Sequence, residues 1–153
     1  MKKQKIDATD KQIIKYLQDG RKSFSYVASK LNVTENTIRN RLNKLYDDKV
    51  FSLRGLVDPE YTPYIQIVIF GLKITGQDLE KKAEDLSNLP GVISTAVVTG
   101  RYDIFMVVEL PTDEDNSALF SFMRNELGKF RGISSIETFP VFRSNNFYVP
   151  YLL

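Results

Sequence analysis

The sequence predicts an α+β protein in two parts: an N-terminal helix-turn-helix and a C-terminal ferredoxin-like domain of order βαββαβ. Apolar residues recur at helical spacing through residues 1–50, whereas β-branched strands and two further helical stretches alternate from Tyr64 onward. The charge changes too, because residues 1–60 carry 13 Lys and Arg against 8 Asp and Glu, and residues 61–153 carry 8 against 11. A basic segment attracts polyanions, so we expect the two parts to have different tasks.

The composition excludes several kinds of chemistry. The chain has 153 residues, of which 42% are hydrophobic and 26% charged, as in ordinary globular proteins. It has no Cys and no His, which excludes disulfides, a thiolate nucleophile, a Cys/His zinc site and an imidazole base. We therefore expect no catalytic residues, no metal site and no cofactor. Neither a membrane-spanning apolar run nor a secretory signal is visible, so we expect a cytoplasmic protein.

Three helices are expected in the first part. Thr9 is the predicted N-cap of the first helix, which should end at Asp19-Gly20. The second helix is expected at about residues 25–31, and a tight turn follows at Asn32-Val33, where Asn tolerates the left-handed conformation. Thr34 then caps the third helix. Three apolar residues form the inward face of that helix: Ile38, Leu42 and Leu45.

The C-terminal part has its own pattern. A short extended stretch is expected at residues 50–53, and Pro59 and Pro63 bracket the predicted linker. The predicted parts are residues 1–58, the linker 59–63, the αβ domain 64–143 and an apolar tail 144–153. Within the αβ domain, strands are expected at residues 64–74, 92–99, 104–110 and 133–142, and helices at 79–86 and from about 111–115 onward.

These strands are apolar on both faces. Ile65, Ile67 and Ile69 alternate with residues that are apolar as well, such as Val68 and Phe70. Two helices can cover only one face of an antiparallel sheet, and the other face would leave a large apolar patch in water. We expect burial against a second copy, giving a homodimer of C₂ symmetry. The alternative is that the N-terminal helices or the tail cover this face.

The second and third helices predict a helix-turn-helix motif at about residues 25–44. Such a motif lays its second helix in the major groove of DNA. A step of about 100° per residue puts Asn36, Asn40 and Asn43 opposite the inward face, with Arg39 beside them. Asn can pair bidentately with adenine and Arg with guanine, so we expect this face to read bases. The alternative is a three-helix bundle with a plain polar face.

Phosphate contacts are expected around the same helix. Its N-terminus at Thr34 can receive a phosphate. Arg41 and Lys44 can reach others, as can Lys22 and the arm formed by Lys2, Lys3 and Lys5. The residues expected to contact double-stranded DNA are Ser25, Thr34, Glu35, Asn36, Thr37, Arg39, Asn40, Arg41, Asn43 and Lys44.

Residues 7–48 resemble the N-terminal domain of the Lrp/AsnC (leucine-responsive, or feast/famine) transcription regulators. The elements that carry this resemblance are Asp10 through Leu17-Gln18, Asp19-Gly20-Arg21, Val27-Ala28 through Leu31, Thr34, and Arg41-Leu42 with Leu45. Those of the second half, which resemble the family's ligand-sensing (RAM) domain, are Pro90-Gly91-Val92, residues 98–103 and residues 132–138. The resemblance covers nearly the whole chain. It implies a winged helix-turn-helix joined by a strand to an αβ sandwich; Asn32 and Lys49 stand where the family usually has Gly.

The resemblance implies a sequence-specific regulator that dimerises through its αβ domain, forms tetramers or octamers, and responds to an amino acid or other small metabolite. The loop that matches the effector site consists of Thr99, Gly100, Arg101, Tyr102 and Asp103. Backbone N–H groups near Gly100 would hold a carboxylate, with help from Arg101, and Asp103 would hold an amino group. The alternative is a tight hairpin turn in which Gly100 serves geometry and Asp103 caps the turn.

Two other functions stay open at this point. One is an architectural, largely non-specific DNA-binding protein without an effector. The other is an enzyme or a stand-alone metabolite-binding module, because ferredoxin-like domains host many activities. The apolar residues 145–153 are either a frayed end or an anchor onto a neighbouring subunit, and we favour the anchor.

Overall fold

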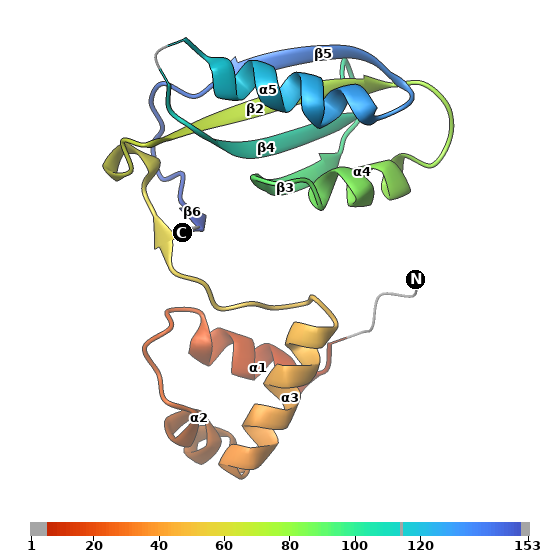
Figure 1. Ribbon diagram of the computed structural model, residues 1–153. Helices are drawn as coiled ribbons and strands as arrows, with labels where there is room; N and C mark the ends of the chain where they lie inside the picture. The colour runs from red at the N-terminus through yellow and green to blue at the C-terminus, as the bar shows by residue number, and fades with distance from the viewer. Residues whose placement is uncertain (1–5, 114, 151–153) are drawn as a thin grey trace. The chain divides into compact units, whose positions relative to one another are not determined.

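The computed structural model describes residues 6–113 and 115–150 and divides the chain into two compact units, residues 1–54 and 55–153 (Figure 1). The second unit therefore begins before the boundary predicted ahead of Pro59. None of the helices in the described ranges is long and apolar enough to cross a membrane.

The first unit is built from three helices. They are α1 (Ala8–Leu17), α2 (Phe24–Leu31) and α3 (Glu35–Asp47). The predicted cap at Thr9 was wrong, because α1 is capped by Asp7, whose carboxylate accepts a hydrogen bond from the N–H of Asp10 at 2.8 Å. The side chain of Asp10 accepts the N–H of Asp7 in return, which makes a capping box of two acidic residues. Ser23 and Thr34 cap the other two helices, the latter as predicted.

Left-handed residues end two of these helices. Asn32 has a φ of 53°, as its place in the predicted turn required, and it closes α2 with its N–H on the carbonyl of Ala28. Lys49, which follows α3, has a φ of 54°. Both positions thus keep the conformation that suits Gly, although neither residue is Gly.

The core of the first unit forms where the three helices meet. Ile38, Leu42 and Leu45 are buried as predicted. Residues 48–55 form no β-hairpin, so the wing that the resemblance implied is not present as strands. Instead the N–H groups of Val50 and Phe51 both donate to the carbonyl of Leu45, at 2.9 and 3.2 Å. The chain therefore folds back on the end of α3 without a partner strand.

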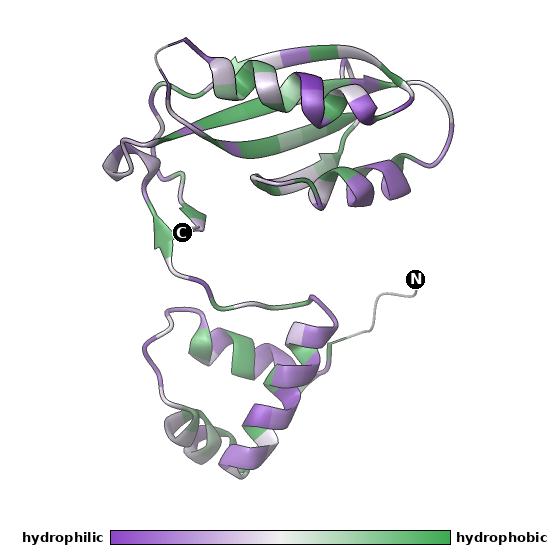
Figure 2. Ribbon diagram, viewed as in Figure 1, coloured by the Kyte–Doolittle hydropathy of each residue, from purple (hydrophilic) through white to green (hydrophobic). Residues whose placement is uncertain are grey.

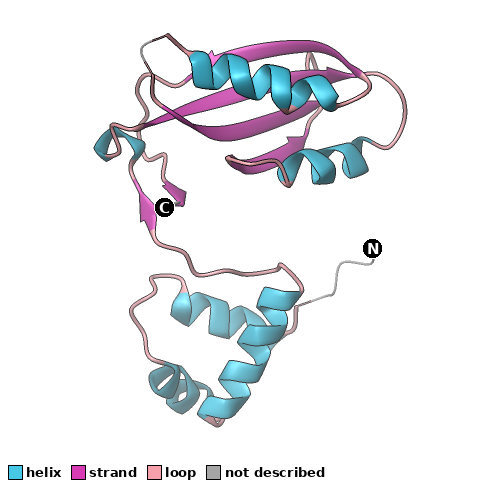
Figure 3. Ribbon diagram, in the orientation of Figure 1, coloured by secondary structure: helices cyan, strands magenta, loops and turns pink. Residues whose placement is uncertain are grey.

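The second unit contains the predicted βαββαβ order (Figure 3). Its elements are β2 (Ile65–Ile74), α4 (Leu79–Ser87), β3 (Val92–Val97), β4 (Ile104–Pro111), α5 (Ser117–Asn125) and β5 (Ile133–Pro140). The strands form one antiparallel sheet in the order β3-β4-β2-β5. A short turn of 3₁₀ helix, Leu127–Lys129, follows α5.

Alternation along the strands separates two faces of this sheet, and apolar residues run along its strands (Figure 2). On one face Phe70 and Met106 are fully buried together with Leu86 of α4 and Phe122 of α5, so both helices cover that face. We call the opposite side the open face; its residues are Ile67, Ile69, Gly71, Phe105, Val107, Glu109, Glu137 and Phe139. Apart from the two glutamates it is apolar as predicted, and neither α4 nor α5 packs on it.

The ends of the second unit pair with each other. Strand β1 (Leu56–Val57) is antiparallel to β6 (Val149–Pro150), and a 3₁₀ turn, Pro59–Tyr61, lies in the predicted linker. Val149 is buried. As far as residue 150 the tail is thus not frayed, because it completes a ladder with its own chain. The anchor onto a neighbouring subunit stays a prediction, and residues 151–153 lie outside the described ranges.

Truncation of Phe70 tests the core of the second unit. Its ring lies 5.5 Å from that of Phe122, centroid to centroid. We expect Phe70→Ala to lower the free energy of unfolding by about 3–5 kcal/mol, because the cavity lies between sheet and helix. Phe120→Ala removes the same atoms from a side chain that is 66% exposed. It should cost less than about 1 kcal/mol in denaturation followed by circular dichroism, and equal losses would contradict this core.

Candidate functional site

The polar face of α3 lies opposite its buried face. Asn36, Asn40 and Asn43 are all exposed, as is Arg39. The helix begins where the Thr34 hydroxyl accepts the N–H of Thr37 at 3.2 Å. The three carboxamides therefore project from a helix whose first turn is capped by Thr34 and whose opposite side is buried in the core. Ser25 and Lys44 are exposed too, while Glu35, Thr37 and Arg41 are partly buried.

Arg39 is held in place by two neighbours. Its Nη2 lies 2.6 Å from Oε1 of Glu35, and its Nε donates to the same oxygen at 3.2 Å. Its guanidinium carbon also lies 5.0 Å from the centre of the Phe24 ring. The pair spans one helical turn, a spacing at which opposite charges meet, so the sequence contained a signal for it. A base contacted by Arg39 must compete with Glu35 for the guanidinium, or it must fit against both side chains together.

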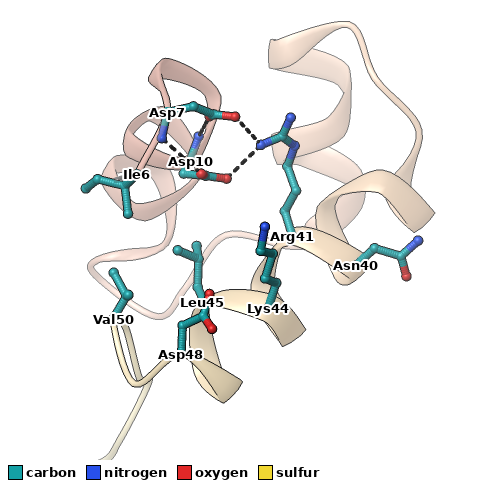
Figure 4. A pocket seen from close by; sticks show the side chains of 9 residues that line it. All are labelled: Ile6, Asp7, Asp10, Asn40, Arg41, Lys44, Leu45, Asp48 and Val50. Atoms are coloured by element: carbon teal, nitrogen blue, oxygen red, sulfur yellow. Dashed lines mark hydrogen bonds and ion pairs between the residues drawn. The ribbon is translucent and has the colours of Figure 1, made fainter. Parts of the chain in front are cut away.

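Arg41 was expected at a phosphate, but the structure places it in an ion pair between helices. Its Nη1 lies 2.6 Å from Oδ2 of Asp7 and 2.8 Å from Oδ1 of Asp10. Figure 4 shows Arg41 turned toward these carboxylates, while Asn40 points away from them. Arg41, Asp7 and Asp10 line a hollow of about 460 Å³ beside α3. Arg41 thus ties the start of α1 to the recognition helix.

The charges of this cluster reinforce one another. The backbone N–H of Asp10 and then the Arg41 side chain lower the pKa of Asp7 below its ordinary value. The hydrogen bonds that Arg41 donates to Asp7 and Asp10 in turn raise the pKa of Arg41. Both partners are therefore charged at neutral pH. The arm of Lys2, Lys3 and Lys5, also expected at phosphates, lies outside the described residues.

The loop at residues 99–103 is fastened to the end of β2 through Asp103. Oδ1 of Asp103 lies 2.9 Å from Nζ of Lys73, and Oδ2 accepts the N–H of Ile74 at 2.8 Å. These two donors, the N–H first, lower the pKa of Asp103. The backbone N–H of Asp103 donates to the carbonyl of Leu72 at 2.9 Å. The Asp103 side chain thus fastens the loop to β2 and accepts no N–H of its own turn in these bonds, so both its turn-capping role and its effector role stay predictions.

The neighbouring residues of the loop bind to β5. The Tyr102 hydroxyl donates to Oε2 of Glu137, which raises the pKa of Tyr102, and Nη2 of Arg101 lies 3.1 Å from the same oxygen. The Tyr102 ring lies over Gly71, where an added Cβ would come within 2.8 Å of it. Thr99 and Gly100 are exposed, and Gly100 has a φ of 122°.

Sequence reasoning named the loop but missed the residues that hold it. Gly71, Lys73 and Glu137 lie 28 or more positions from their loop partners. Lys73 did carry a local signal, because it is a lone charge near the end of an apolar strand. Only the pairing of β2 with its two neighbours shows which loop such a charge meets.

Comparisons with known proteins find relatives of both parts of the chain. Residues 6–46 match the AsnC-type helix-turn-helix domain, and residues 67–146 match the Lrp/AsnC ligand binding domain. An uncharacterised HTH-type transcriptional regulator of Pyrococcus abyssi is 33% identical over 139 residues, which are 90% of this chain and 86% of that protein.

Two solved structures have the same fold. Escherichia coli AsnC is similar with a TM-score of 0.61 at 24% identity, over 92% of this chain and 95% of that one. A transcriptional regulator from Neisseria meningitidis, solved as a complex with L-Met, is similar with a TM-score of 0.61 at 21% identity, over 91% of both chains.

Acid titration tests the cluster at the start of α1. The lowered pKa means that Asp7 stabilises the fold above its ordinary pKa of 3.8 and loses this effect as the pH falls through the lower, folded value. We expect Asp7→Asn to weaken the protection of α1 amides against hydrogen exchange at pH 7. The difference from the unaltered protein, compared at equal pH, should shrink below pH 3.8.

The matched control is Asp47→Asn, at the exposed end of α3. A carboxylate there opposes the helix dipole, so its loss should not weaken protection. A difference at Asp7→Asn that stays constant down to acid pH would contradict the role given to this carboxylate.

Proposed function

Since the chain belongs to the Lrp/AsnC family of helix-turn-helix transcription regulators, we propose that it recognises specific DNA sequences with α3. The family is one of regulators, and the chain is not an enzyme. The observation that carries the proposal is the exposed carboxamide face of α3, opposite a buried one. We therefore expect the protein in the cytoplasm, where it would meet its DNA.

In the proposed complex α3 lies in the major groove. Asn36, Asn40 and Asn43 pair with adenine edges, and Arg39 reaches a guanine. Ser25, Thr34, Thr37 and Lys44 contact the phosphates beside them, the helix N-terminus adding its own N–H groups. Glu35 takes part through Arg39, whose direction it sets. Arg41 contributes by holding α3 against α1 as well as through any phosphate within its reach.

We infer that the protein is a homodimer through the open face. Ile69, Phe105 and Val107 are only partly buried there, and Phe139 is 38% exposed. Apolar groups of this kind, side by side on one sheet, are rarely left in water. A second copy of the same face would cover them with C₂ symmetry, and dimers would assemble further into tetramers or octamers.

The effector is proposed to bind at residues 99–103. The support is the match to a ligand binding domain and the similar fold of a regulator solved with L-Met. The Gly100 backbone and Arg101 would hold the ligand's carboxylate. Thr99 and Tyr102 would line one side of the ligand, and Asp103 would face the part of the ligand beyond its carboxylate. Binding would change how dimers pack and thereby re-space the recognition helices.

One observation favours the second candidate function, that of an architectural DNA-binding protein. Arg39 is already paired with Glu35, which weakens the case for guanine reading. An architectural protein would bind DNA through the same helices with little sequence preference and without an effector. Competition between selected and random duplexes at one salt concentration separates the two functions.

Substitutions on α3 test the division of roles. With an operator selected from a random library, the double variant Asn40→Ala and Arg39→Ala should lose about tenfold or more in operator affinity, because each bidentate contact discriminates by about 1–3 kcal/mol. Random duplex should bind it nearly as before. Lys44→Ala should weaken both duplexes alike and lower the salt slope by about 1. Equal losses on both duplexes for the double variant would refute base reading.

A charge on the open face tests the dimer. Val107→Arg and Phe139→Arg each place a guanidinium in the proposed interface, where burial without a partner is costly. Both variants should sediment as monomers at concentrations at which the unaltered protein is dimeric or larger. Glu84→Arg, on the exposed side of α4, should sediment unchanged. Circular dichroism checks that each variant is folded, and folded variants that keep the original mass would rule out this interface.

A further inference from the structure

We propose that Lys73 determines the chemical class of ligand at the loop of residues 99–103. Its ammonium takes the place at Asp103 that the ammonium of an α-amino acid would need. The loop therefore selects carboxylates that carry an oxo group at Cα over the corresponding amino acids. This inference rests on the proposed function, which puts the effector at this loop.

The first support is that Asp103 is already engaged. One carboxylate oxygen lies 2.9 Å from Nζ of Lys73, and the other accepts the N–H of Ile74 at 2.8 Å. The Asp103 side chain is 20% exposed, so little of it is left for a ligand. A carboxylate binds an ammonium through accessible oxygens, and here each oxygen already accepts one hydrogen bond, one of them from a cation of the same chemistry.

The second support is charge. An incoming ammonium that contacts Asp103 would lie beside Nζ of Lys73, and two positive charges at such a distance repel each other. Arg101, with its side chain 78% exposed, adds a further positive charge on this loop. An α-ammonium thus meets repulsion at a carboxylate whose two oxygens each have a donor already. The carboxylate of the same ligand is attracted by Lys73 and Arg101, each of which also has a carboxylate partner of its own in Asp103 and Glu137.

The third support is what Lys73 offers instead. An ammonium has three donors, of which one is directed at Asp103, and the side chain is 46% exposed. An oxo oxygen at Cα can accept one of the others. Gly100 leaves the approach clear, because no atom lies within 4 Å of where its Cβ would be. A 2-oxo acid therefore finds a donor for its oxo oxygen in Lys73, whereas the ammonium of an amino acid would have to share Asp103 with Lys73.

Matched ligand pairs test this selection. Isothermal titration of the full-length protein with alanine and pyruvate, leucine and 4-methyl-2-oxopentanoate, and phenylalanine and phenylpyruvate compares ligands that differ only at Cα. In the pair that binds best, the oxo acid should bind the unaltered protein about tenfold more tightly than the amino acid. Lys73→Met should shift that ratio by about tenfold toward the amino acid, because Asp103 becomes accessible.

Two further variants separate charge from general damage. Lys81→Met removes the same charge from the exposed surface of α4 and should keep the original ratio. Lys73→Arg keeps a cation at Asp103 and should keep the preference for the oxo acid. Circular dichroism establishes that each variant is folded.

Three results would overturn the proposal: amino acids that bind the unaltered protein as tightly as their oxo acids, an unchanged ratio in Lys73→Met, or no binding of any oxo acid. Operator binding without ligand is measured in parallel. If the unaltered protein binds its operator but one of these results is found, only this inference is wrong. If the unaltered protein binds no operator at all, the result counts against the proposed function.

Discussion

The burial of one side of α3 is the constraint on which the DNA-facing surface depends. Ile38, Leu42 and Leu45 enter the core of the first unit, and a helix turns by about 100° per residue, so the direction of every other side chain on α3 follows. The ion pair of Arg41 with Asp7 and Asp10 adds a second attachment on the flank of the same helix. A helix held in this way presents its carboxamides in a constant arrangement, which base reading requires.

The same reasoning applies to the sheet, with a period of two instead of 3.6. Helices α4 and α5 cover one side, so the residues between the buried ones must form the open face. Tyr102 belongs to the loop of residues 99–103, yet its ring lies over Gly71 and 6.1 Å from that of Phe139. The proposed effector loop and the proposed dimer surface therefore share side chains. A ligand that moves Tyr102 would be felt at the open face without any long-range pathway.

The sequence predicted what depends on local periodicity and missed what depends on tertiary pairing. The helices and strands lie within a few residues of their predicted positions because apolar spacing reports burial directly. The ion pairs of Arg41 and Lys73 were not predicted, since their carboxylate partners lie more than 25 positions away. The wing implied by the resemblance is not present as strands, because the N–H groups of Val50 and Phe51 donate to Leu45 and residues 50–53 have no partner strand. The cap at Asp7 was missed because two acidic residues can form a capping box as well as Thr with Glu.

Charge and specificity are divided between different residue types in the first unit. Nine of the 13 basic residues in the range 1–60 are Lys, and two of the four Arg, Arg39 and Arg41, are paired with carboxylates of their own unit. Lys contacts phosphate as a point charge, with no preference for a base. The excess positive charge therefore supplies attraction to any duplex, and it weakens with salt. Discrimination falls mainly to neutral carboxamides, whose hydrogen bonds release no counterions, and to Arg39, whose charge is already paired with Glu35. A regulator built this way would lose total affinity as salt rises while keeping its ratio of specific to non-specific binding, because only the shared, electrostatic part of the binding free energy depends on salt.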